Sequence, residues 1–169
     1  LGVHTTFNLL GPLSNPAGAP RQIIGVWHRD LTERLANVLA LLGTERAWVV
    51  HGEDGLDEIT SSGKTFVAEA RNGQVKTFEI DPVSFGLDHG PLAHLRGGDA
   101  ETNAATIREV FEGKRKDEAR SLVIMTAAAA LVVGEVTDDL SNAARLAERA
   151  IDSGAAWEKL ELLKLATKA

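Results

Sequence analysis

The segment His51–Ile59, "HGEDGLDEI", places four carboxylates within six positions, directly after the apolar run Ala47–Val50. In proteins, Mg²⁺ is usually held by one or two carboxylates together with the phosphates of a substrate. Asp57 and Glu58 are adjacent, so this pair could present Mg²⁺ to a phosphorylated ligand. Judged by composition alone, however, a solvated acidic turn explains such a cluster more often than a metal site does.

Two glycine-containing segments suggest phosphate-binding loops, and both have a simpler explanation. In Ser61–Thr65, "SSGKT", a P-loop would need glycine five positions before Gly63, where Glu58 stands, and a helix after the Lys-Thr pair. We therefore reject a P-loop. The segment Gly97–Asp99, "GGD", could bring the backbone close to an anion at the start of a helix. A role for Asp99 as the helix N-cap is favoured over that interpretation.

The segment Phe7–Pro16, "FNLLGPLSNP", combines bulky apolar residues with two interruptions by glycine or proline. This mixture predicts an irregular backbone, and such segments often line a pocket or pack on a neighbouring domain. Asn8 could supply amide hydrogen bonds to a ligand. A plain connection into the first strand explains the segment equally well, and local reasoning does not choose between the two.

The composition excludes or disfavours several classes of function. The 169 residues contain no cysteine, which excludes disulfides, a thiol nucleophile and a cysteine-based zinc site. The five histidines lack metal-ligand spacing, and His51 is best explained as a hydrogen-bonded structural residue. The G-x-S-x-G elbow of serine hydrolases is absent. A net charge of −6 disfavours a broad nucleic-acid surface.

The longest apolar run, Met125–Val133, is far shorter than the ~20 residues that a membrane-spanning helix needs. We therefore expect no membrane partner and no nucleic-acid partner. With the missing cysteines, this favours the cytoplasm as the location of the protein.

The first half of the chain predicts a strand, a helix and a second strand. Residues 21–28 form an apolar run rich in β-branched residues, and Ala47–Val50 forms another. Between them, Asp30 could cap a helix that ends before Gly43. A unit of this kind gives a parallel strand pair with a right-handed crossover.

The second half predicts a hairpin followed by helices. Residues 64–70 and 74–80 flank Asn72-Gly73, the strongest short-range hairpin signal. Helices are predicted after Asp99 and over residues 118–133, 137–153 and 155–168. The whole pattern predicts a single α/β domain over residues 1–169, with three layers and a mainly parallel sheet that carries an antiparallel hairpin.

Four stretches, in this order along the chain, resemble the anthranilate phosphoribosyltransferase family of the tryptophan pathway. They are "LGVHTTFNLLGPLSNPAGA" (residues 1–19), "VVHGEDGLDEI" (49–59), "GGDAETNA" (97–104) and "AIDSGAAWEKL" (150–160), the last after an Ala-rich helix. The first two are specific to this family, and together the stretches span nearly the whole chain.

The resemblance implies a larger two-domain enzyme, of which this chain is the latter part of the large α/β domain. It implies that the nitrogen of anthranilate attacks phosphoribosyl pyrophosphate and that pyrophosphate leaves, with Mg²⁺ present. It also implies that Asp57 and Glu58 bind the Mg²⁺, and that Asn8, Gly11 and Pro12 line the anthranilate channel. No residue of this chain is assigned a catalytic role.

The family's glycine-rich phosphoribosyl pyrophosphate loop and its anthranilate-binding arginine come before the FNLLGP stretch, and nothing in this chain matches them. We therefore expect the chain alone to be inactive and to need the N-terminal portion of the same enzyme. The resemblance also implies that the full-length enzyme is a homodimer. Two alternatives stay open at this point. One is an enzyme like the pyrimidine nucleoside phosphorylases, and the other is a catalytically silent binding module of the same fold.

Overall fold

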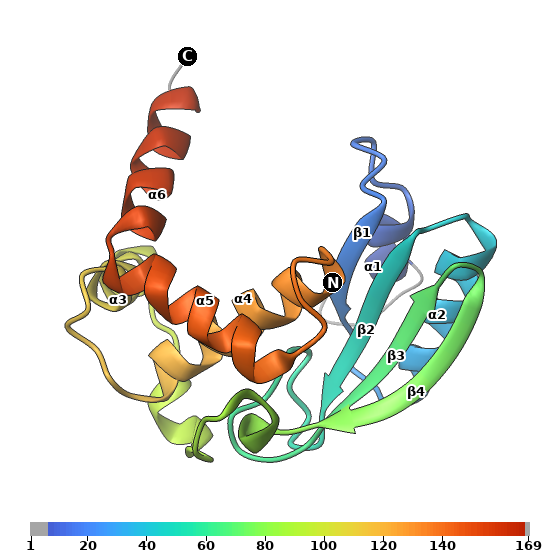
Figure 1. Ribbon diagram of the computed structural model, residues 1–169, viewed down its shortest axis with the longest axis horizontal. Helices are drawn as coiled ribbons and strands as arrows, with labels where there is room; N and C mark the ends of the chain where they lie inside the picture. Colours follow the sequence, from blue (N-terminus) through green and yellow to red (C-terminus); the bar gives the residue numbers. More distant parts are fainter. Residues whose placement is uncertain (1–6, 168–169) are drawn as a thin grey trace.

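The computed structural model describes residues 7–167 (Figure 1). The beginning of the first family-like stretch, residues 1–6, and the expected end of the last helix at Lys168 lie outside the described residues. Within the described part, no helix is long and apolar enough to cross a membrane.

One four-stranded sheet forms the centre of the structure. Its strands are β1 (Arg21–Gly25), β2 (Arg46–Gly52), β3 (Thr65–Arg71) and β4 (Gln74–Ile80), and their order in space is β1-β2-β3-β4. Strands β1 and β2 are parallel and are joined through helix α2 (Asp30–Leu41), as the strand–helix–strand pattern predicts. The other two strand pairs are antiparallel.

The α/β class is therefore confirmed, but the sheet over residues 7–167 is mixed rather than mainly parallel. The physical reason is the short connection after β2. A parallel neighbour would require a crossover, usually through a helix. Residues 53–64 instead turn the chain back so that β3 pairs antiparallel with β2. The expected hairpin follows, with positive φ angles of 51° at Asn72 and 77° at Gly73.

Two buried clusters cover the two faces of the sheet and make the expected three layers. On one face, Ala47, Val49 and Ala68 pack with Leu35 and Leu39 of α2. On the other face, residues such as Trp48 and Val67 pack with the apolar helix α4 (Glu118–Val133) and with α5 (Leu140–Asp152). Figure 1 shows α2 on one side of the sheet and α4 and α5 on the other. Burial on both faces fixes the strands as a rigid frame for the loops at their ends.

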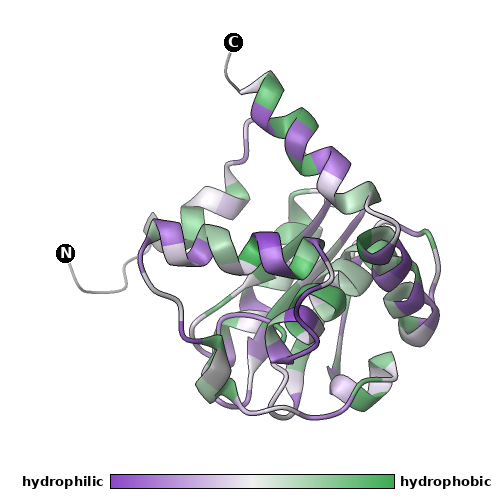
Figure 2. Cartoon of the chain, turned by 90° about the vertical axis from the view of Figure 1, so that its left-hand side faces the viewer, coloured by the Kyte–Doolittle hydropathy of each residue, from purple (hydrophilic) through white to green (hydrophobic). Residues whose placement is uncertain are grey.

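Helices α3 (Ala100–Phe111) and α6 (Ala155–Ala166) lie away from the sheet. None of the residues of α6 is buried, and Leu162, Leu163 and Leu165 are each more than half exposed. Figure 2 shows the helix next to the C-terminus projecting from the body of the molecule, with hydrophobic (green) and hydrophilic (purple) positions alternating along it. Two short 3-10 helices, Pro82–Phe85 and Leu92–Leu95, complete the connections between β4 and α3.

Apart from shifts of one or two residues at the ends of strands and helices, four features differ from the sequence-based expectation. Residues Phe7–Leu13 form helix α1 instead of irregular backbone. Pro12 is tolerated there because it is the penultimate residue of a short helix, where its missing N–H removes only one hydrogen bond. At the end of the helix, the Ser14 N–H donates to the Leu10 carbonyl at 2.8 Å. Strand β1 ends at Gly25, since the chain turns into α2 soon afterwards.

The remaining two differences concern helix caps. Arg29, not Asp30, is the N-cap of α2, and its side chain makes no capping hydrogen bond. The ring Nδ1 of His28 instead accepts from the Asp30 backbone N–H at 3.2 Å. Helix α5 begins at Leu140, not Thr137, because Asp139 accepts a hydrogen bond from the backbone N–H of Asn142 and so fixes the first turn.

Candidate functional site

The acidic loop lies between β2 and β3, at the edge of the sheet where the parallel strands β1 and β2 end. In open α/β sheets this carboxyl edge is where ligands bind. Backbone hydrogen bonds close the loop at its base, from Glu53 N–H to the Lys64 carbonyl at 2.9 Å and from Gly52 N–H to the Leu56 carbonyl at 2.8 Å. The loop is therefore a compact structure rather than a loose solvated turn.

Two of the four acids in the loop are occupied by structural hydrogen bonds. Glu53 accepts from the Lys64 backbone N–H at 2.8 Å. Asp54 accepts from the Leu56 backbone N–H at 3.0 Å, from the Ser62 hydroxyl at 2.5 Å and from the Thr60 hydroxyl. Burial alone would raise the pKa of Asp54, but the hydrogen bonds from Ser62 and Thr60 outweigh it and hold that pKa below the ordinary value. Asp54 therefore stays ionised as a structural anchor.

The other two acids, Asp57 and Glu58, are exposed, and within residues 7–167 neither side chain forms a hydrogen bond or an ion pair. Partial burial and the negative charge of Asp57 together raise the pKa of Glu58. An unneutralised carboxylate pair of this kind would gain from a cation. Over the described residues, no group of three metal-ligating side chains is present. Two carboxylates fit Mg²⁺, which commonly takes its other ligands from water and substrate phosphates.

The main chain of this pair rests against the end of β1. A β-carbon on Gly25 would overlap the carbonyl oxygen of Asp57 and would lie 2.7 Å from its carbonyl carbon. On the neighbouring strand, the ring Nδ1 of His51 donates to the Val26 carbonyl at 2.8 Å. His51 is thus the hydrogen-bonded structural residue that its position at a strand end predicts, and it ties β2 to the segment just beyond Gly25.

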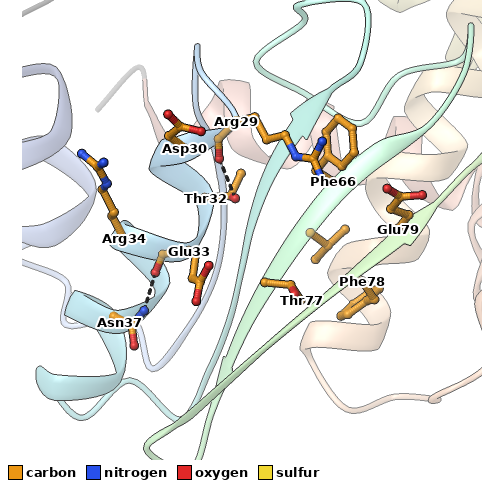
Figure 3. Close-up of a pocket in the computed structure, with 11 residues that line it drawn as sticks. Arg29, Asp30, Thr32, Glu33, Arg34, Asn37, Phe66, Thr77, Phe78 and Glu79 are labelled. Atoms are coloured by element: carbon orange, nitrogen blue, oxygen red, sulfur yellow. Dashed lines mark hydrogen bonds between the residues drawn. The ribbon is translucent and has the colours of Figure 1, made fainter.

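A cavity of about 710 Å³ opens between α2 and the β3–β4 hairpin (Figure 3). The guanidinium of Arg29 lies 3.6 Å from the centre of the Phe66 ring, and Glu79 points into the same space. None of the predicted site residues lines this cavity. Its charged side chains are of both signs, so its chemistry does not indicate a metal or phosphate site.

The expected substrate-lining residues lie on α1. Gly11 is exposed, with open space beside it, and Pro12 is half-buried. The backbone of Asn8 belongs to α1, but its side chain lies outside what the structure describes. No backbone hydrogen bond joins the described residues of α1 to the acidic loop. Asp57 and Glu58, adjacent in the chain, are thus both exposed in the acidic loop, and the structure shows no hydrogen bond from either to Gly11 or Pro12.

Other expectations of the sequence are settled by the structure. The rejection of a P-loop is confirmed, since strand β3 follows Lys64. The capping role of Asp99 is confirmed by its acceptance of the Thr102 N–H at 2.9 Å. Sequence reasoning missed Gly25 and the anchoring role of Asp54. A glycine inside an apolar strand run was a usable signal, because such a glycine often marks a close backbone approach.

Known proteins resemble this chain over most of its length. Residues 1–157 match the glycosyl transferase family, a/b domain. An anthranilate phosphoribosyltransferase from Rhodopseudomonas palustris strain BisB5 is 52% identical over 169 residues, which are 100% of this chain and 50% of the relative. The chain spans about half the length of the curated relatives it matches.

Two solved structures are similar over almost the whole chain. The anthranilate phosphoribosyltransferase from Thermus thermophilus is 37% identical, with a TM-score of 0.90, over 99% of this chain and 49% of the other. The enzyme from Saccharomyces cerevisiae in complex with phosphoribosyl pyrophosphate and Mg is 30% identical, with a TM-score of 0.84, over 95% of this chain and 46% of the other.

Proposed function

The chain belongs to the glycosyl transferase family whose a/b domain its residues 1–157 match, and from this premise we propose that it is part of an anthranilate phosphoribosyltransferase. In the proposed reaction, the amino nitrogen of anthranilate forms a bond to C1 of the ribose, the bond from C1 to pyrophosphate breaks, and the nitrogen loses a proton. The observation that carries the proposal is the compact acidic loop, in which Asp57 and Glu58 alone of the four acids lack a protein partner among the described residues.

We infer that Asp57 and Glu58 hold Mg²⁺ beside the pyrophosphate of the donor substrate. Their position at the carboxyl edge of the sheet supports this role. So does the Mg in the complex of the yeast relative. When bound, the ion would neutralise the negative charge that develops on the leaving pyrophosphate. The chain's own contribution is to bind and orient, because this chemistry depends mostly on positioning.

The remaining features of the proposal concern parts beyond this loop. Gly11 and Pro12, and Asn8 with them, are proposed to border the anthranilate channel on α1. The other half of the enzyme is proposed to supply the rest of the donor site, since the chain spans about half the length of its curated relatives. We also propose that this α/β segment is the latter part of a larger catalytic domain, and that the complete enzyme is a cytoplasmic homodimer.

A chimera provides the test of this function. In the R. palustris relative, this chain would replace the segment that it matches, and the loss of anthranilate fluorescence would be followed with phosphoribosyl pyrophosphate and Mg²⁺. We expect turnover by the chimera and none by the 169-residue chain alone. A second chimera with Asp57→Asn and Glu58→Gln should lose on the order of 100-fold or more in turnover while remaining folded, which is the scale of a lost electrostatic contact to the transition state.

The outcomes separate the alternatives. Phosphorolysis of pyrimidine nucleosides by the chimera, without anthranilate turnover, would indicate a nucleoside phosphorylase. A folded chimera that neither turns over anthranilate nor binds phosphoribosyl pyrophosphate would indicate a silent module. Full activity of the Asp57→Asn, Glu58→Gln chimera at limiting Mg²⁺ would remove the metal role from this pair.

A further inference from the structure

We propose that Gly25 and Asp54 are positioning residues that fix the main chain of the Asp57–Glu58 pair from two sides. The inference rests on the metal role proposed for that pair. It adds that the pair is held in place before any ligand arrives, by a strand end on one side and by a network of hydroxyl groups on the other. Neither Gly25 nor Asp54 is placed as a ligand of the metal.

Gly25 acts through the space that its missing side chain leaves. A β-carbon there would overlap the Asp57 carbonyl oxygen and would lie 3.6 Å from the backbone nitrogen of Glu58. The atoms that it would strike belong to the main chain of the pair itself, not to a side chain that could swing aside. Strand β1 cannot retreat easily, because Gly25 is paired with Val50 and its neighbours Ile24 and Val26 are buried. A side chain at position 25 must therefore displace Asp57 and Glu58.

Backbone torsion does not explain the glycine at position 25. Its φ angle is not among the positive values of the chain, so alanine could adopt the same backbone conformation. Gly43 presents the opposite case, with a φ of +81° and nothing within 4 Å of an added β-carbon. Alanine at Gly43 would create strain without a collision, and alanine at Gly25 would create a collision without strain. The two glycines therefore form a matched pair for experiment.

Asp54 acts by accepting hydrogen bonds from residues on both sides of the pair within the loop. One of its oxygens accepts from the backbone of Leu56, just before the pair. The other accepts from the hydroxyls of Thr60 and Ser62, just after it. Thr60 is itself fixed in place, because it is fully buried and its backbone N–H donates to the Thr65 hydroxyl at 3.0 Å. One carboxylate thus ties together both flanks of Asp57 and Glu58.

Binding of Mn²⁺ to the isotope-labelled 169-residue chain tests the proposal. Carboxylate sites that suit Mg²⁺ also take Mn²⁺, and the paramagnetic ion broadens the NMR signals of nearby backbone amides. The titration would compare the unaltered chain with Gly25→Ala, Asp54→Asn and Gly43→Ala. The double variant Asp57→Asn, Glu58→Gln identifies the signals that depend on the pair. Urea unfolding of every variant separates lost affinity from lost stability.

We expect Gly25→Ala and Asp54→Asn each to weaken Mn²⁺ binding at the pair by roughly tenfold or more, the effect typical of residues that orient metal ligands. Gly43→Ala should lose stability and keep its Mn²⁺ affinity. If Gly25→Ala does not fold, Asp54→Asn decides the question, because it introduces no collision. Unchanged affinity in a folded Gly25→Ala or in Asp54→Asn overturns the positioning role of that residue while the metal role stands. Broadening that survives in the double variant overturns the metal role and the inference with it.

Discussion

The guanidinium of Arg46 donates a 2.8 Å hydrogen bond to the carboxylate of Glu69 across the β2–β3 pair, and both side chains are almost fully buried. Trp48 donates to the same carboxylate oxygen at 2.9 Å, and the Lys76 ammonium lies 2.9 Å from the other oxygen. Arg46 also donates to the Val132 carbonyl at 2.6 Å, at the end of α4. This ionic cluster links the sheet to the helical layer at the edge opposite the acidic loop.

Glu69→Gln should destabilise the chain by about 3 kcal/mol, because it leaves the buried charge of Arg46 with one remaining carboxylate partner, the largely exposed Asp138 at 3.3 Å. Urea unfolding at neutral pH measures the change. Glu79→Gln is the matched control, since Glu79 also pairs with a lysine, Lys64, but is exposed. An equal loss of stability in both variants would contradict the special role of burial.

Ionisation of Glu69 should contribute to the pH dependence of the stability of the chain. Burial would raise its pKa, but hydrogen bonds and charges from Trp48, Lys76 and Arg46 outweigh burial and lower it. A carboxyl whose pKa is lowered in the folded state stabilises the protein at any pH above the ordinary pKa of that carboxyl, which is 4.5 for Glu69. That stability is lost as the pH falls through the pKa of the folded state. The unfolding free energy should therefore fall on acidification below that pH, and less steeply in Glu69→Gln. Parallel curves for the two proteins would disprove the assignment.

Glu58→Gln should stabilise the chain at neutral pH when no divalent cation is present. Burial and the charge of Asp57 raise the pKa of Glu58 in the folded state. A raised carboxyl pKa means that stability is lost as the pH rises from the ordinary value through the folded pKa, so the cost is present at neutral pH. Thermal unfolding in a chelating buffer measures the gain. Asp88→Asn, at another loop position, is the control, because it also removes one negative charge from a chain whose net charge is −6. An equal gain in stability in Asp88→Asn would show that the effect is not specific to Glu58.

Glu135 should be less tolerant of alanine than of glycine. It has a φ of 61° after the end of α4, and its carboxylate pairs with Arg21 at 2.8 Å and with Arg71 at 3.0 Å. Both substitutions remove these partly exposed ion pairs, which are worth little individually. Only glycine relieves the left-handed backbone, so Glu135→Ala should be less stable than Glu135→Gly by about 1 kcal/mol. Urea unfolding of the two variants would show it, and equal stability would mean that the backbone is not strained.

Local patterns in the sequence determined most of the elements of this protein. The Asn72-Gly73 turn, the helix over residues 118–133 and the cap at Asp99 depend on neighbours a few positions apart, and the structure has all three. The acidic pair Asp57–Glu58 was also visible, because the adjacency of two carboxylates is a property of the chain itself. Helix α1 was missed, since glycine and proline near the end of a short helix give the same local signal as an irregular segment.

Only the tertiary structure decided which acids of the loop are available to a ligand and what holds them. Glu53 and Asp54 look like Asp57 and Glu58 in the sequence, but their partners, Lys64, Thr60 and Ser62, reach them only when the loop closes. The contact between Gly25 and Asp57 joins the end of one strand to a loop that follows another. Such contacts depend on how the strands pair and on which way β3 runs, and pairing is set by the burial of both sheet faces rather than by any short stretch of residues.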